Sequence, residues 1–269
     1  MTIVDRGQGS PLVLVPGLQG RWEYLSPAVD ALAQSHRVIT FSLRDERLEG
    51  STTDATRGLD ALVEQIDATL DDRGLARAAI CGVSLGGRVA LRFAALRPDR
   101  TSALVLASVP GPGWHLKPSH QMYARFPWLF APLFFAGMPG RLRAELAIAL
   151  PDRSERRAFA RRQLRTALRA PVSPSRMAAR ARLIDGMDSA ADCARISAPT
   201  LVMTGEASLD HVVPAGGTCE YVRLIAGSRA VTLARTGHLG CITRPHAFAE
   251  LIGGFLENVG VTRSSEHAA

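Results

Sequence analysis

Residues 78–87 read AAICGVSLGG, an apolar run that passes into a serine with a glycine two positions away on either side. The apolar residues 78–81 are typical of a buried strand, and residues 85–96 carry apolar side chains at helical spacing before Pro98. A serine on the sharp turn between a strand and a helix projects from the sheet, and flanking glycines permit the close backbone approach that such a turn needs. The stretch therefore predicts that Ser84 is exposed at the carboxyl end of a strand.

Strand-like and helix-like segments alternate on both sides of this unit. The predicted strands cover residues 12–15, 38–41, 103–107, 200–204 and 230–233, and the predicted helices cover residues 26–33, 59–70, 219–225 and 245–257. Continuous apolar strands joined by helices are typical of a parallel sheet that is buried on both faces. The predicted fold class is α/β, with a doubly wound and mostly parallel sheet.

Residues 111–195 interrupt the alternation. They have helical patterns and many arginines, and none of their segments reads as a buried strand. We therefore expect an inserted helical cap, or lid, on a core formed by residues 1–110 and 196–260. The small and polar residues 261–269 predict a flexible tail.

Composition and charge exclude several classes of protein. The net charge is +7, but the sequence lacks the basic stripe with interleaved aromatic residues that marks a nucleic-acid binder. The four cysteines are widely separated, so neither a metal site nor a disulfide framework is expected. The longest apolar stretch, residues 126–138, contains two prolines and is too short for a membrane span, so no stable membrane insertion is predicted. No signal-peptide pattern is visible, and we expect a cytoplasmic location.

A serine hydroxyl needs a base to become a nucleophile at neutral pH, and histidine is the residue suited to that task. His238 lies in residues 236–240 (TGHLG), directly after a predicted strand, where a loop projects over the same sheet edge as Ser84. The other six histidines lack that context. We predict His238 as the base, with a structural role in the final loop as the alternative.

The base in turn needs a carboxylate that fixes its tautomer and stabilises its cation. Asp210 fits this role because it follows the strand at residues 200–204 and precedes Pro214. Glu206 is an alternative in the same loop, and Asp210 could instead only cap the following helix.

An oxyanion formed by attack on a carbonyl group needs two backbone N–H donors. The predicted donors are the amides of Leu85, directly after the serine, and of Leu18, in the glycine-containing loop at residues 16–20 (PGLQG).

These stretches together resemble the α/β-hydrolase superfamily across almost the whole chain. The resemblance rests on residues 82–87 (GVSLGG), residues 210–214 (DHVVP) and the Gly237-His238 pair. It implies an α/β-hydrolase fold and a Ser-His-Asp triad that needs no cofactor. A serine at position 84 also argues against relatives that use an aspartate nucleophile, such as haloalkane dehalogenases.

The function expected from this resemblance is hydrolysis of a small carboxylic ester or lactone through an acyl-enzyme, by a monomer or homodimer. The alternatives are a carbon–carbon bond hydrolase on the same fold and a ligand-binding receptor with slow turnover. Aromatic side chains in the cap could line a pocket above Ser84 or pack within the cap. The residues expected at the substrate pocket are Gln19, Trp22, Phe126, Trp128, Phe130 and Leu239.

Four arginines, Arg157, Arg161, Arg165 and Arg169, recur every four residues in the cap. This spacing places them along one face of a helix, where they repel one another unless they are solvated or paired. The stripe predicts either a water-facing surface or a site for an anionic substrate.

Overall fold

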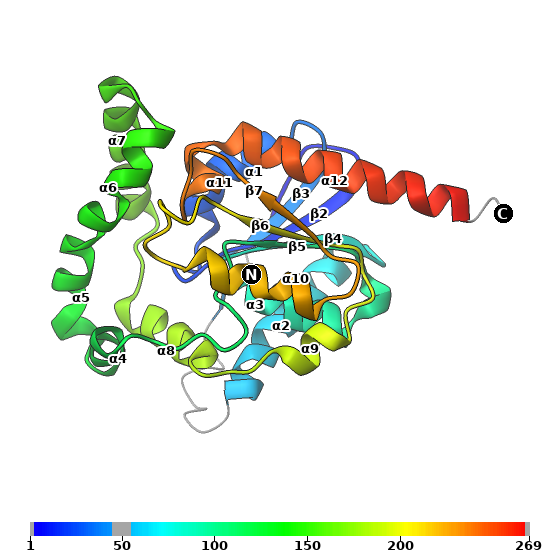
Figure 1. Cartoon of the computed structure of the whole chain (residues 1–269), viewed down its shortest axis with the longest axis horizontal. Helices are drawn as coiled ribbons and strands as arrows, with labels where there is room; N and C mark the ends of the chain where they lie inside the picture. Colours follow the sequence, from blue (N-terminus) through cyan, green and yellow to red (C-terminus); the bar gives the residue numbers. More distant parts are fainter. Residues whose placement is uncertain (1–2, 45–54, 267–269) are drawn as a thin grey trace.

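The computed structural model describes residues 3–44 and 55–266, and this part of the chain forms one seven-stranded sheet (Figure 1). The strand order is β1-β3-β2-β4-β5-β6-β7, and every neighbouring pair is parallel except β1 with β3. The doubly wound, mostly parallel sheet predicted from the sequence is therefore confirmed. The strands are β1 (Ile3–Arg6), β2 (Pro11–Val15), β3 (Arg37–Phe41), β4 (Ala78–Val83), β5 (Thr101–Ala107), β6 (Thr200–Thr204) and β7 (Arg229–Thr232).

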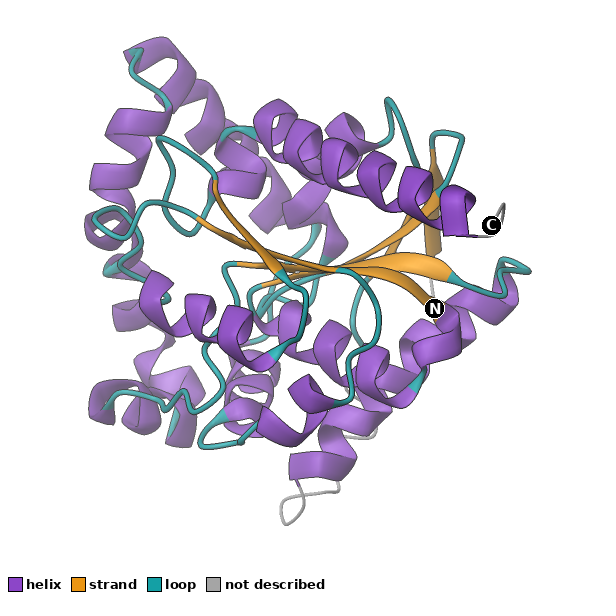
Figure 2. Ribbon diagram, turned by 45° about the vertical axis from the view of Figure 1, so that its right-hand side comes forward, coloured by secondary structure: helices purple, strands orange, loops and turns teal. Residues whose placement is uncertain are grey.

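Helices cover both faces of the sheet, as Figure 2 shows. Side chains of a strand point alternately to its two faces, so β2 contributes Leu12 and Leu14 to one apolar core and Val13 and Val15 to the other. The first core is closed by α1 (Ser26–Leu32), α11 (Gly240–Thr243) and α12 (Pro245–Glu266). The second is closed by α2 (Ala55–Asp72), α3 (Leu85–Leu96) and α10 (Ala215–Leu224).

The elements at the two ends of the described chain, β1 and α12, differ from the sequence prediction. β1 was not predicted because its residues, IVDR, are short and partly polar, and it pairs only at the antiparallel edge of the sheet. The closing helix α12 continues to Glu266, past the predicted end at residue 257. It therefore includes residues 261–266 of the predicted tail, while residues 267–269 lie outside the described part of the chain.

The insertion between β5 and β6, which is described along its whole length, consists of helices joined by loops and contains no strand. Its helices are α4 (Pro118–Arg125), α5 (Pro127–Ala136), α6 (Met138–Ala149), α7 (Arg153–Arg169), α8 (Pro174–Ile184) and α9 (Ala190–Ala194). Helices α4 to α7 stand beside the core, at the left of Figure 1, whereas α8 and α9 pack back onto α2 and α3. Among the described helices, none combines the length and the apolar character that crossing a bilayer requires. We keep the name cap for residues 111–195.

Both ends of the cap are fixed to the core by one buried arginine. Arg88 of α3 is 1% exposed, and its Nη1 donates hydrogen bonds to the carbonyl oxygens of Gly111 (2.8 Å) and Pro112 (3.1 Å). Its Nη2 donates to the carbonyl oxygen of Met187 at 2.6 Å. Gly111 and Pro112 lie where the chain enters the cap, and Met187 lies near where it returns. A single guanidinium therefore donates to backbone carbonyl groups at both connections between the cap and the core.

We expect Arg88→Met to lower the free energy of unfolding by about 2–4 kcal/mol, because it leaves several buried carbonyl groups without a donor. Chemical denaturation followed by circular dichroism measures this change. The matched control is Arg223→Met, at an exposed position on α10, which should change stability by no more than about 0.5 kcal/mol. Equal stability of the two variants would contradict the role assigned to Arg88.

Candidate active site

Ser84 lies on a strained turn between β4 and α3. Its backbone φ of 55° is in the left-handed region, which non-glycine residues occupy only when the surrounding structure enforces it. A Cβ atom on Gly86 would lie 2.4 Å from the carbonyl oxygen of Val15, and one on Gly82 would lie 2.3 Å from that of Gly86. Only glycine fits at both positions, so the spacing of the motif is explained by backbone packing.

The loop at residues 16–20 lies against this turn. A Cβ atom on Gly17 would come within 3.3 Å of Ser84 Cβ, so the loop passes directly beside the serine. The N–H of Gly20 donates to the carbonyl oxygen of Gly17 at 2.8 Å, which closes a tight turn. Arg180 of α8 donates from Nη1 to the carbonyl oxygen of Leu18 at 2.9 Å and holds the loop from the cap side. The oxyanion roles of Leu18 and Leu85 stay predictions.

His238 and Asp210 come together from two different loops. The chain places Asp210 after β6 and His238 after β7, and His238 Nδ1 lies 3.3 Å from Asp210 Oδ2. The other carboxylate oxygen, Oδ1, accepts the backbone N–H groups of Val212 (2.9 Å) and Val213 (2.8 Å). One oxygen of Asp210 therefore caps the turn and the other faces the imidazole, while its role as the carboxylate that orients the base stays a prediction. Its side chain is 2% exposed and that of His238 is 12% exposed.

Glu206, the alternative acid, points to a different group. Its Oε1 accepts the backbone N–H of Arg235 at 2.6 Å, so it fixes the loop that leads to His238. The two loops also pack closely, since a Cβ atom on Gly205 would lie 2.3 Å from the carbonyl oxygen of Gly237. The contact between Asp210 and His238 thus depends on glycines in both loops.

Comparison with known proteins identifies the family to which this fold belongs. The model of the alpha/beta hydrolase family matches residues 12–251. This chain belongs to the alpha/beta hydrolase family.

Among curated relatives, this hydrolase is 26% identical over 258 residues to the pimeloyl-[acyl-carrier protein] methyl ester esterase of Nitrosomonas europaea, covering 91% of this chain and 95% of that protein. It is 27% identical over 264 residues to the 2-hydroxymuconate semialdehyde hydrolase of a Pseudomonas species, covering 94% and 88%. It spans only parts of two other relatives, 12% of polyketide synthase ThaQ of Burkholderia thailandensis and 48% of esterase YbfF of Escherichia coli. Among solved structures, the enol-lactonase of Burkholderia xenovorans has the same fold, with a TM-score of 0.76, 22% identity, and coverage of 95% of this chain and 96% of that one.

A further carboxyl group, which the sequence did not single out, reaches the loop of His238 from the cap. Glu145 of α6 is 1% exposed, and its Oε1 accepts the backbone N–H of Leu239 at 2.8 Å. Burial raises the pKa of this carboxyl, although the backbone N–H groups of Gly237 and Leu239 and the nearby His238 favour its charged form. Sequence reasoning missed the contact because it joins residues 94 positions apart in different units of the fold.

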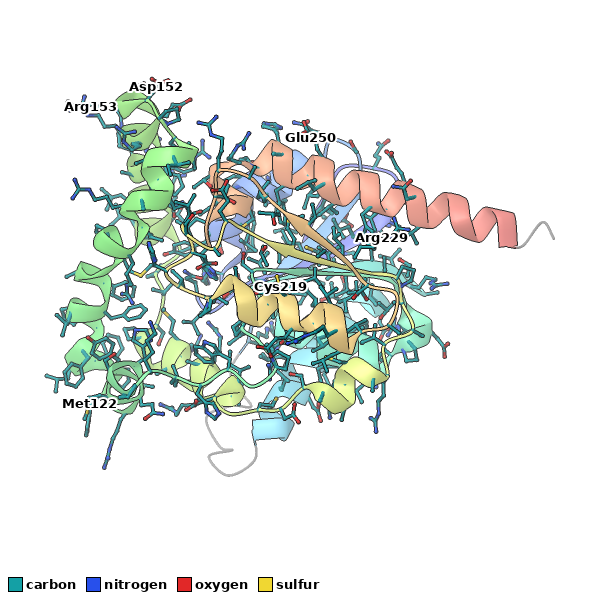
Figure 3. All side chains as sticks on the ribbon, in the orientation of Figure 1. Met122, Asp152, Arg153, Cys219, Arg229 and Glu250 are labelled. Atoms are coloured by element: carbon teal, nitrogen blue, oxygen red, sulfur yellow. The ribbon has the colours of Figure 1, made fainter. Side chains whose placement is uncertain are left out.

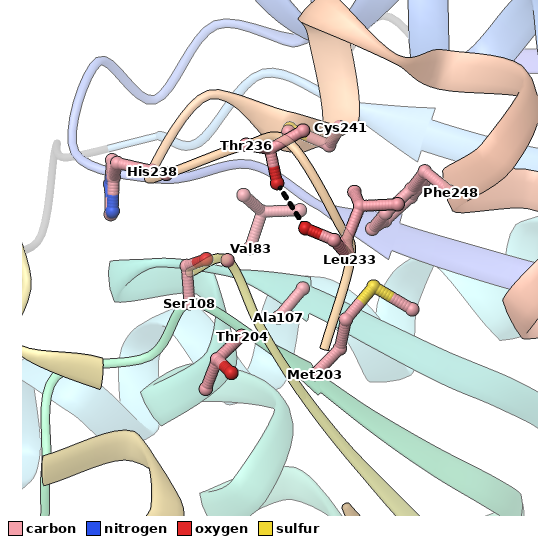
Figure 4. Close-up of a pocket in the computed structure, with 13 residues that line it drawn as sticks. Val83, Ala107, Ser108, Met203, Thr204, Leu233, Thr236, His238, Cys241 and Phe248 are labelled. Carbon is pink, nitrogen blue, oxygen red and sulfur yellow. Dashed lines mark hydrogen bonds between the residues drawn. The ribbon is translucent and has the colours of Figure 1, made fainter. Parts of the chain in front are cut away.

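A small cavity lies between the carboxyl ends of β4, β5 and β6 and the loop that carries His238 (Figure 4). It is lined by Val83, which precedes Ser84, and by His238 at one end, and it extends to Cys241 and Phe248 at the other. Its volume of about 10 Å³ is that of a single water molecule, so it is a packing space beneath the site and not a substrate pocket. A hydrogen bond from Ser84 Oγ to His238 stays a prediction.

Two of the residues expected at the substrate pocket lie at these loops. Gln19 belongs to the loop beside Ser84, and its Oε1 would be 3.9 Å from a Cβ atom on Gly17. Leu239 follows His238 and binds Glu145 through its amide. Both are therefore placed near the reacting groups, although their contact with substrate stays a prediction.

The other four expected pocket residues lie outside these two loops. Trp22 is in a short helix, η1 (Trp22–Leu25), and the guanidinium of Arg6 lies 5.4 Å from the centre of its ring. Trp128 of α5 is 69% exposed and Phe126 precedes that helix at an exposed position, while Phe130 stacks on Tyr123 with ring centres 5.4 Å apart. The aromatic residues thus both pack within the cap and face solvent.

The arginine stripe of α7 faces solvent. Arg157, Arg161, Arg165 and Arg169 are all exposed, and no residue of α7 is buried. Figure 3 shows the start of this helix, at Asp152 and Arg153, at the outer tip of the cap, far from the sheet. The exposure agrees with the water-facing interpretation of the stripe.

Proposed function

We propose that this hydrolase cleaves a small carboxylic ester or lactone through an acyl-enzyme formed on Ser84. The observation that carries the proposal is the strained turn that holds Ser84 at the same sheet edge as the hydrogen-bonded pair of His238 and Asp210. A nucleophile, a base and an orienting carboxylate are the groups that acyl transfer requires.

In the proposed mechanism, Ser84 Oγ attacks the carbonyl carbon while His238 accepts the hydroxyl proton at Nε2. Asp210 Oδ2 accepts the hydrogen bond from Nδ1–H and stabilises the imidazolium that forms. The amides of Leu18 and Leu85 donate to the oxyanion. His238 then protonates the leaving alcohol, and water, activated by the same histidine, releases the acid and restores Ser84.

The ester and lactone classes are supported by the relatives, which include a methyl ester esterase and, by fold, an enol-lactonase. A second candidate is hydrolysis of a carbon–carbon bond. It is favoured by the alignment with 2-hydroxymuconate semialdehyde hydrolase, which covers 94% of this chain. Both reactions use an activated serine and an oxyanion site, so the fold does not choose between them.

The test combines a substrate panel with a covalent probe. The purified protein should hydrolyse short-chain p-nitrophenyl esters or lactones faster than a ring-cleavage dienone, and a fluorophosphonate should label Ser84, as mapped by peptide mass spectrometry. Faster turnover of the dienone would establish the second candidate. Labelling without turnover of any substrate would favour a ligand-binding receptor, and an absence of both labelling and turnover would end the proposal.

A further inference from the structure

We propose that Glu145 is a positioning residue that couples the position of the cap to the competence of the base. It holds the loop of His238 only when α6 lies against that loop. This inference rests on the proposed function, because it concerns how the proposed base is held.

Two contacts link α6 to the loop after β7. Glu145 Oε1 accepts the backbone N–H of Leu239 at 2.8 Å, and Nη2 of Arg235 donates to the carbonyl oxygen of Ile148 at 3.0 Å. These contacts bracket His238 in the sequence, one on each side. A shift of α6 away from the core would therefore release both sides of the loop that carries the imidazole.

The carboxylate of Glu145 is also unusual in its surroundings. Within the described part of the chain, its second oxygen, Oε2, is buried without a hydrogen-bond partner. A buried carboxylate with only one of its oxygens hydrogen-bonded lowers stability. Packing alone therefore does not explain why a glutamate occupies this otherwise apolar stretch of α6. An electrostatic role beside the imidazole provides such a reason.

The charged and titratable groups that face Glu145 come from several elements. His238, from the loop after β7, attracts the carboxylate, and Asp210, from the loop after β6, repels it. Burial raises the pKa of the Cys241 thiol, on α11, to about 12, so this group stays neutral. Arg235, on the same loop as His238, directs its guanidinium to the carbonyl oxygen of Ile148 on α6. A negative charge at Glu145 therefore stabilises the imidazolium from the cap side, while Asp210 stabilises it from the core side.

The experiment compares Glu145→Gln and Glu145→Ala with the parent, using kcat and KM for a p-nitrophenyl ester across the pH range. Glutamine can still accept the Leu239 N–H but carries no charge, so the acidic limb of the kcat/KM profile should move to lower pH by about 0.5–1 unit. Alanine also loses the hydrogen bond and should lower kcat by about 10–100-fold with a smaller change in KM, because the base is then less well positioned.

The matched control is Glu155→Ala, an exposed glutamate on α7 of the same cap, which should leave the profile of the parent unchanged. An acidic limb that stays in place in Glu145→Gln, with Ser84 labelled by the fluorophosphonate in that variant, would overturn this inference and leave the proposed function intact. If the unmodified protein were neither labelled nor active, both this inference and the proposed function would be overturned. Thermal denaturation of each variant separates loss of fold from loss of positioning.

Discussion

Alanine at position 84 is expected to lower kcat/KM for p-nitrophenyl acetate by about 10⁴- to 10⁶-fold. The substitution removes the only group that can form the acyl-enzyme in the proposed mechanism, while the oxyanion donors and the base remain. The fold should be retained, because Ser84 contributes its backbone N–H to the carbonyl oxygen of Ala107, and alanine keeps that bond. Steady-state kinetics with purified protein measure the loss, and circular dichroism checks the fold.

Ser108 provides the matched control for this variant. It follows β5, lines the small cavity next to Val83, and has a backbone φ of 48°, so it resembles Ser84 in backbone conformation and in its place at the end of a parallel strand. Ser108→Ala should keep kcat/KM within about 3-fold of the parent, because an isolated hydroxyl without a base is a poor nucleophile. Retained activity in Ser84→Ala together with a large loss in Ser108→Ala would show that the nucleophile is Ser108, at the end of β5, and that the assignment to Ser84 is wrong.

The sequence was sufficient to predict the core because each central strand is apolar on both faces. β2 illustrates this, since all its buried residues are aliphatic and divide between the two cores by simple alternation. β1 could not be predicted in the same way. Its partly exposed residues, IVDR, lack the alternation and the apolar run that mark a strand, and only pairing with β3 defines it.

The candidate site was predictable to the extent that its groups follow strands. Ser84, Asp210 and His238 each come after a parallel strand, and the carboxyl ends of parallel strands meet at one edge. Glu145 follows no strand, and its position depends on how α6 packs against the loop after β7. No local pattern encodes that packing, so the structure was needed to find it.

Asparagine at position 210 is expected to lower kcat/KM by about 10³- to 10⁴-fold without unfolding the protein. Oδ1 of Asp210 accepts the N–H groups of Val212 and Val213, and an asparagine oxygen can keep both bonds. Its amide nitrogen then takes the place of Oδ2 and donates to His238 Nδ1. The imidazole must in that case carry its proton on Nε2, where it cannot accept the proton of Ser84.

The matched control is Glu206→Gln, in the same loop. Glutamine keeps an acceptor for the Arg235 N–H, so activity should stay within about 3-fold of the parent. The comparison is read from kcat/KM at a pH where the parent is fully active, with unfolding curves for both variants. If Glu206→Gln carried the large loss and Asp210→Asn did not, the 3.3 Å contact between Asp210 and His238 would not orient the base, and Asp210 would only cap its own turn. Because the two carboxylates lie four residues apart on one loop, the pair of variants tests which of them orients the base.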